Sequence, residues 1–251
     1  MKLFKMRVLI LALLTFSLAS CNFEEAKKTT QRSTVFIGVD VSGSFAKTKK
    51  FSDGMAFLSH YIHAHLNNEN GLAKPVDLYV GGIGGDKKED PQDFFPVHDF
   101  MGLSKKGIQN KLTREFSRQR DNLTDFNTFF RRIKSIVKQK NLVLAPIEVI
   151  MVTDGVPEIA NRTKKAIKQA YQNIEFKNLE NLSRTVSVRI LYASPKVGRH
   201  WRKYVPTKKI KVWTVEPRVM YGWKSQLQRN GKKALHKWIM DNIDLRLKSR
   251  G

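Results

Sequence analysis

The sequence VFIGVDVSGS, at residues 35–44, joins an apolar run to three side chains that carry oxygen. Val35 to Val39 show no alternation of polar and apolar residues, which is typical of a strand covered on both faces. The run ends at Asp40, and Ser42 and Ser44 follow at alternate positions. This pattern predicts a buried strand whose carboxyl end presents one carboxylate and two hydroxyl groups.

A second stretch, IEVIMVTDG at residues 147–155, has the same design and runs into Asp154. Apolar periodicity predicts further strands at 76–83, 94–97, 185–193 and 210–215, and helices at 47–66, 104–119, 125–139, 162–171 and 232–247. Pro96 places the strand at 94–97 on an edge of the sheet. This alternation of strands and helices predicts an α/β fold: a three-layer, doubly wound, mainly parallel sheet with helices on both faces, Rossmann-like in type.

The two acidic strand ends are expected to meet. In an open parallel sheet, ligands bind beyond the carboxyl ends of the strands, where the topology switches. Asp40 and Asp154 both stand at such ends. Carboxylates and hydroxyl groups are hard oxygen donors, which suit Mg²⁺ or Mn²⁺ better than zinc or copper.

The segments Asp40-Val41-Ser42-Gly43-Ser44 and Thr153-Asp154-Gly155 resemble the metal-ion-dependent adhesion site (MIDAS) of the von Willebrand factor A (VWA) domain family. That site is written Asp-x-Ser-x-Ser, then a threonine, then an aspartate in a Thr-Asp-Gly turn. The resemblance extends over nearly all of residues 33–247. It implies a Mg²⁺ or Mn²⁺ site formed by Asp40, Ser42, Ser44, Thr124 and Asp154.

The threonine is the element that departs from the family pattern. The family usually has glycines before it, whereas this chain has Asn122-Leu123 before Thr124. Thr128 is the alternative, one turn inside the predicted helix.

The resemblance implies that the site binds a protein or surface ligand through its divalent cation. Neutral hydroxyl ligands leave the cation much of its charge, so the cation seeks a carboxylate from a partner protein. An alternative needs no metal, because Asp, Ser and Gly are ordinary turn residues and a serine often caps a helix.

Signatures of enzymes are missing from the sequence. There is no Gly-x-Ser-x-Gly elbow, and position 42 lacks the second aspartate of haloacid-dehalogenase-type phosphatases. The glycines at 81–85 lack the spacing of a phosphate-binding loop. His60, His63 and His65 have no fourth metal ligand nearby in sequence and are expected to be surface histidines. We therefore expect a binding protein and not an enzyme.

The N-terminus resembles that of a bacterial lipoprotein precursor. Lys2, Lys5 and Arg7 precede an apolar run at 8–19, and residues 18–21 read LASC. The resemblance implies a signal peptide at 1–20, lipidation of Cys21 and a membrane anchor in the bacterial cell envelope. Asn22 in place of an inner-membrane retention aspartate favours an outer membrane, with the face left open. Residues 21–32 are expected to form the lipidated cysteine and a tether, and residues 33–251 a VWA-like domain with an insertion near 84–120.

The net charge of +24 suggests an anionic partner. Residues 196–250 hold sixteen Lys or Arg residues, three acids and interleaved aromatic residues. This composition supports an alternative function, a basic scaffold that binds an anionic membrane surface or polyanion through its C-terminal third, with the metal site degenerate. It is equally typical of a solvated basic face that binds no partner. Nucleic acid is not an expected partner, because a secreted lipoprotein rarely meets it.

Overall fold

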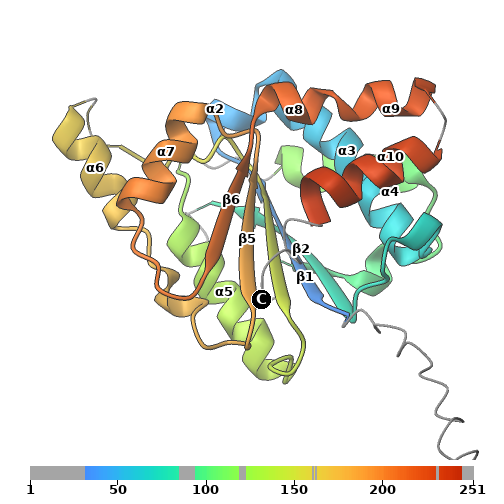
Figure 1. Ribbon diagram of the computed structural model, residues 1–251, viewed down its shortest axis with the longest axis horizontal. Helices are drawn as coiled ribbons and strands as arrows, with labels where there is room; N and C mark the ends of the chain where they lie inside the picture. The colour runs from blue at the N-terminus through green and yellow to red at the C-terminus, as the bar shows by residue number, and fades with distance from the viewer. Residues whose placement is uncertain are drawn as a thin grey trace, which may run out of the picture. The chain divides into compact units, whose positions relative to one another are not determined.

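The computed structural model describes residues 32–84, 94–118, 123–159, 161, 163–229 and 232–244. Within these residues, six strands form one sheet in the order β3-β2-β1-β4-β5-β6 (Figure 1). Every neighbouring pair is parallel except β2 and β3. This order is typical of doubly wound sheets, and it confirms the predicted α/β fold. The strands are β1 (Thr34–Asp40), β2 (Asp77–Ile83), β3 (Phe94–Pro96), β4 (Ile147–Val152), β5 (Val186–Leu191) and β6 (Lys211–Val215).

Helices cover both faces of the sheet (Figure 1). One face packs against α3 (Lys49–Leu66), α4 (Lys105–Arg118), α8 (Pro217–Tyr221), α9 (Trp223–Arg229) and α10 (Lys232–Ile239). The other face packs against α5 (Phe126–Gln139), α6 (Lys164–Gln172) and α7 (Pro195–Tyr204). Short elements complete the described chain: α2 (Gly43–Ala46), the 3₁₀ turns η1 (Glu69–Gly71), η3 (Val97–Asp99) and η4 (Phe176–Asn178), and a π-helical turn η5 (Met240–Asp244).

The packing of β1 explains why polar and apolar residues do not alternate in its sequence. Val35, Ile37 and Val39 belong to the core beneath α3, whereas Phe36 belongs to the core beneath α5. Both faces of the strand are therefore apolar, because both are covered.

Gly38 in β1 allows α5 to approach the sheet closely. A Cβ atom at position 38 would lie 2.6 Å from Cζ of Phe129 and 2.8 Å from Cδ1 of Ile83. The Phe129 ring occupies this space and stacks on Phe94, with ring centroids 5.6 Å apart.

Some elements differ from the sequence prediction. The helix predicted from residue 47 begins at Lys49, because the short α2 comes first. Helix α7 was not predicted, although Ser194 caps it by accepting a hydrogen bond from the Val197 amide and Pro195 is its first residue. In the segment near 84–120, β3 forms the antiparallel edge strand and α4 packs beside α3.

Residues 1–31 lie outside the described residues, so the predicted signal peptide, Cys21 and most of the tether lie outside them too. The chain from Arg32 onward forms one compact unit. No helix among the described residues is long and apolar enough to cross a bilayer.

Candidate metal-binding site

The predicted site lies at the switch point of the sheet. β1 and β4 are neighbours, with Val39 paired to Val152, so Asp40 and Thr153 emerge side by side. From β1 the chain continues to β2 on one side, whereas β4 continues to β5 on the other. Loops that diverge in this way leave a crevice at the carboxyl edge of the sheet, where ligands bind in open α/β folds. Figure 1 shows this edge at the top, where α2 follows β1.

Asp40 is buried, with 1% of its surface exposed. Its Oδ2 accepts a 2.6 Å hydrogen bond from the Thr153 hydroxyl, and its Oδ1 accepts a 2.9 Å bond from the Ser42 amide. Burial raises the pKa of Asp40 to about 6, and the negative charge of Asp154 also raises it, whereas the hydrogen bonds from Thr153 and Ser42 lower it. The fold thus holds an incompletely compensated carboxylate, which a cation nearby would stabilise.

Ser42 and Ser44 present their hydroxyl oxygens to each other at 3.2 Å. Ser42 is buried, whereas Ser44 is exposed. Ser42 stands at the N-cap position of α2, but its hydroxyl makes no capping hydrogen bond. Capping therefore does not account for this serine.

The serine geometry fits a hard cation. Adjacent ligands of an octahedral Mg²⁺ ion, each about 2.1 Å from the metal, lie about 3 Å apart. The two hydroxyl oxygens have nearly this separation already.

Asp154 lies at the rim of the site, in a turn that Thr153 and Gly155 fix. The Thr153 hydroxyl accepts a hydrogen bond from the Gly155 amide, and Gly155 has a φ of +74°, a conformation that favours glycine. The Trp201 indole donates to the Gly155 carbonyl at 2.7 Å. The Asp154 carboxylate is partly exposed and lies 4.0 Å from the Lys50 ammonium.

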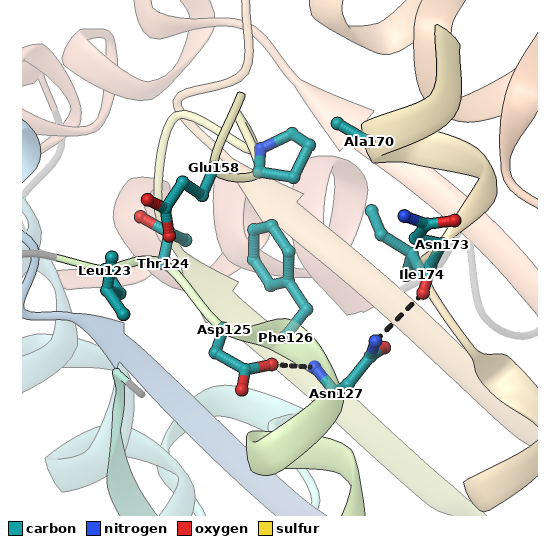
Figure 2. A pocket seen from close by; sticks show the side chains of 10 residues that line it. Leu123, Thr124, Asp125, Phe126, Asn127, Glu158, Ala170, Asn173 and Ile174 are labelled. Atoms are coloured by element: carbon teal, nitrogen blue, oxygen red, sulfur yellow. Dashed lines mark hydrogen bonds between the residues drawn. The ribbon is translucent and has the colours of Figure 1, made fainter. Parts of the chain in front are cut away.

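The two candidate threonines have different surroundings. The Thr128 hydroxyl donates to Asp125, the N-cap of α5, at 2.6 Å, and it accepts from Arg131 at 2.6 Å. Thr124 lines a pocket of about 210 Å³ and points toward Glu158, in the loop that follows Asp154 (Figure 2). The residues that line this pocket include none of Asp40, Ser42, Ser44 and Asp154, and the hydrogen bonds described around Asp40 involve neither of these two threonines. The choice of Thr124 as the threonine ligand therefore stays a prediction.

Two residues of this site were not predicted as parts of it. Thr153 was noted only as part of the Thr-Asp-Gly turn, yet its hydroxyl holds Asp40. Lys50 faces Asp154 because α3 passes over the end of β4, which no local sequence signal shows. Among the described residues, no group of three or more His, Cys, Asp or Glu side chains could hold a metal. A cation at this edge would therefore depend on the hydroxyl oxygens as well as the two carboxylates.

The helix-α3 histidines do not converge. His65 is buried and pairs with Asp244 at 3.2 Å, so the expectation of surface histidines is wrong for this residue. His63 pairs with Glu69 at 2.9 Å, and the His60 ring packs against Trp223.

Two of the aromatic residues of the C-terminal third belong to the core. Trp201 and Trp223 are 2% and 3% exposed. These two side chains are thus withdrawn from any stacking surface, which weakens the case for a polyanion-binding face built on them.

The pKa of Asp40 predicts a pH-dependent stability for the cation-free protein. The folded-state value of about 6 exceeds the ordinary value of 3.8, so this group favours folding below pH 3.8 and loses that contribution as pH rises through 6. Asp40→Asn leaves no ionisable group at position 40, so it should remove this loss of stability at high pH. In chelator, we expect the variant to exceed wild type in unfolding free energy by up to roughly 3 kcal/mol at neutral pH, with the gap closing toward pH 4.

Denaturant unfolding of both proteins from pH 4 to pH 7.5 measures this difference. Added Mg²⁺ should stabilise wild type alone at neutral pH. A gap between the two proteins that does not change with pH would contradict the assignment.

Comparison with known proteins bears on the fold. No protein-family model matches the chain, and no curated protein matches it. Among solved structures, 41 chains match. Two crystal structures of the pilus adhesin SpaC from Lactobacillus rhamnosus GG give TM-scores of 0.50 and 0.47 at 12% identity, covering 84% of this chain and 31% of the adhesin. The VWA domain of SpRpn10 gives a TM-score of 0.33 at 9% identity, covering 85% of this chain and 96% of that domain.

This chain thus spans about a third of the adhesin's length. At such identities the comparisons concern the fold alone, and the match to the adhesin at a TM-score of 0.50 agrees with the α/β fold described above.

Proposed function

We propose that this chain is a membrane-anchored lipoprotein whose VWA-like domain binds a protein ligand through a divalent cation, Mg²⁺ or Mn²⁺. The observation that carries the proposal is the pair of hydroxyl oxygens of Ser42 and Ser44, 3.2 Å apart, beside the buried carboxylate of Asp40. The residues proposed to hold the cation, directly or through water, are Asp40, Ser42, Ser44, Thr124 and Asp154.

The arrangement suits recognition of an acidic side chain. The cation, when bound, would supply a positive charge that attracts a carboxylate from the partner. Thr153 and the Ser42 amide hold Asp40 in place, and the exposed Ser44 marks the side from which a ligand can approach. Lys50 near Asp154 adds a second positive group at the rim.

The membrane part of the proposal rests on Cys21. Acyl chains on this residue would hold the domain at a membrane of the bacterial cell envelope without a spanning helix. The comparison with an adhesin supports protein binding as the role of the domain, and we assign it no catalytic activity.

Affinity capture from the native envelope tests the proposed function. Full-length protein in detergent should retain one or a few envelope proteins in Mg²⁺ and release them in chelator, whereas moderate salt should leave them bound. The alternative basic scaffold gives the reverse result, because salt screens its charges. The double variant Ser42→Ala/Ser44→Ala should fail to retain these proteins even in Mg²⁺, whereas the matched control Ser52→Ala, on the exposed side of α3, should retain them like wild type. Retention that chelator leaves unchanged would exclude the cation-dependent function.

A further inference from the structure

The amino edge of the sheet, opposite the metal site, forms one continuous surface. The Val76 amide donates to the Ser33 carbonyl, and the Thr34 amide donates to the Pro146 carbonyl, both at 2.8 Å. The Ile147 amide donates to the Thr185 carbonyl at 2.9 Å. The segments entering β2, β1, β4 and β5 thus lie in a row, at the lower end of the strands in Figure 1.

Apolar side chains project from this edge. Leu144 is 86% exposed, more than any other large apolar residue that the structure describes, and its neighbour Val143 is 41% exposed. Val76, in the entry to β2, is 50% exposed. The turn that carries Leu144 is held by a 2.7 Å hydrogen bond from the Ser183 hydroxyl to the Ala145 carbonyl. Its apolar tip is therefore a defined feature of the fold.

Positive charges surround these apolar residues. The segments 74–76, 138–146, 181–185 and 207–210 contain no Asp or Glu. The carboxylates that border them have partners: Glu180 accepts from the Lys208 amide, and Asp77 accepts from the Tyr79 hydroxyl. The exposed basic residues of this edge are Lys74, Lys138, Lys140, Arg184, Lys208 and Lys209.

The chain also enters the domain at this edge. The Arg32 guanidinium donates to the carbonyls of Lys74 and Pro75 at 2.9 and 2.8 Å, which fastens the first described residue beside Val76. Cys21 precedes Arg32 by eleven residues, a reach of at most about 40 Å for an extended chain. A lipid on Cys21 would keep this edge within reach of the bilayer.

We propose that the amino edge of the sheet docks on an anionic lipid surface, with Leu144 and Val143 entering the interface and the lysine and arginine side chains on the headgroups. Apolar residues rimmed by cations suit a surface that is negative outside and apolar beneath. This orientation points the metal site away from the membrane, toward a partner. The inference rests on the proposed lipid anchor and extends it.

Site-specific fluorescence tests the docking in the full chain, expressed in a host that processes lipoproteins and reconstituted into vesicles. Leu144→Cys and Lys47→Cys are each labelled with an environment-sensitive dye. Lys47 is exposed and follows α2 at the opposite edge, so it is the matched control. With phosphatidylglycerol in the vesicles, the label at 144 should shift to shorter wavelength and the label at 47 should not. The shift should disappear in pure phosphatidylcholine and at high salt.

The charge-reversed pair Lys74→Glu/Lys140→Glu should also lose the shift while keeping its melting temperature, because both side chains are exposed. If the label at position 144 emits at the wavelength typical of water in both kinds of vesicle, the proposal is overturned. The same result is expected if the lysines bind a soluble polyanion and not a lipid surface. The anchor is tested separately, by flotation with neutral vesicles and by the absence of labelling at Cys21 in the unsubstituted chain. If the anchor fails, the phosphatidylglycerol-dependent shift at 144 still decides the docking.

Discussion

Replacement of both Ser42 and Ser44 by alanine should weaken Mn²⁺ binding by at least about 100-fold, since losing even an outer-shell partner of a metal ligand costs 10- to 100-fold. Two hydroxyl ligands would be lost together, and the remaining carboxylates would face each other with less compensation. Isothermal titration of the full chain with Mn²⁺ measures this loss.

The fold should survive this change. The Ser42 hydroxyl makes no capping bond, and Ser44 is exposed, so neither is a main support of the structure. Ser52→Ala should bind Mn²⁺ like wild type. A double variant that retains wild-type affinity would show that the hydroxyl groups do not bind the cation.

Phe129→Ala should destabilise the domain by about 3–5 kcal/mol, because it removes a fully buried ring from between α5 and the sheet. Gly38→Ala alone should destabilise it by about 1–3 kcal/mol, since the added methyl would lie 2.6 Å from the Phe129 ring. Denaturant unfolding in Mg²⁺ measures both changes.

The combination of the two substitutions gives the decisive result. In the Phe129→Ala background, the methyl of Gly38→Ala enters vacated space, so its effect should become neutral or stabilising. Simple additivity of the two costs would show that Phe129 is not what requires glycine at position 38.

The sequence predicted those parts of the fold that one segment at a time can encode. β1 and β4 were recognised because strands covered on both faces lack polar residues at every second position. Asp40 and Asp154 could be expected at one edge, because parallel strands align their carboxyl ends. The hydrogen bond from Thr153 to Asp40 could not be predicted, because it requires β1 to lie next to β4 in the sheet. No local sequence pattern specifies which strands are neighbours.

Of two other differences, one has a local cause and the other a tertiary cause. Helix α7 was missed because half of its residues are Lys, Arg or His, although the Ser194-Pro195 start was available as a signal. His65 was expected on the surface, but η5 covers α3 on that side, and the Asp244 carboxylate in η5 pairs with the His65 ring. The spacing of residues on α3 gave no indication of this second covering layer.

The sheet has chemically different ends. The carboxyl edge holds Asp40 and Asp154 with the two serines, and the amino edge holds Leu144 among exposed lysines. This difference links the two proposals, because a domain held to a membrane by its amino edge would present its carboxyl edge, with the proposed metal site, to a partner.

Anomalous scattering from crystals soaked in Mn²⁺ locates the cation that we propose at the carboxyl edge of the sheet. We expect one strong peak there, about 2.2 Å from the hydroxyl oxygens of both Ser42 and Ser44. A saturating soak that leaves this edge without a peak, or places manganese only elsewhere on the chain, would contradict the proposed site.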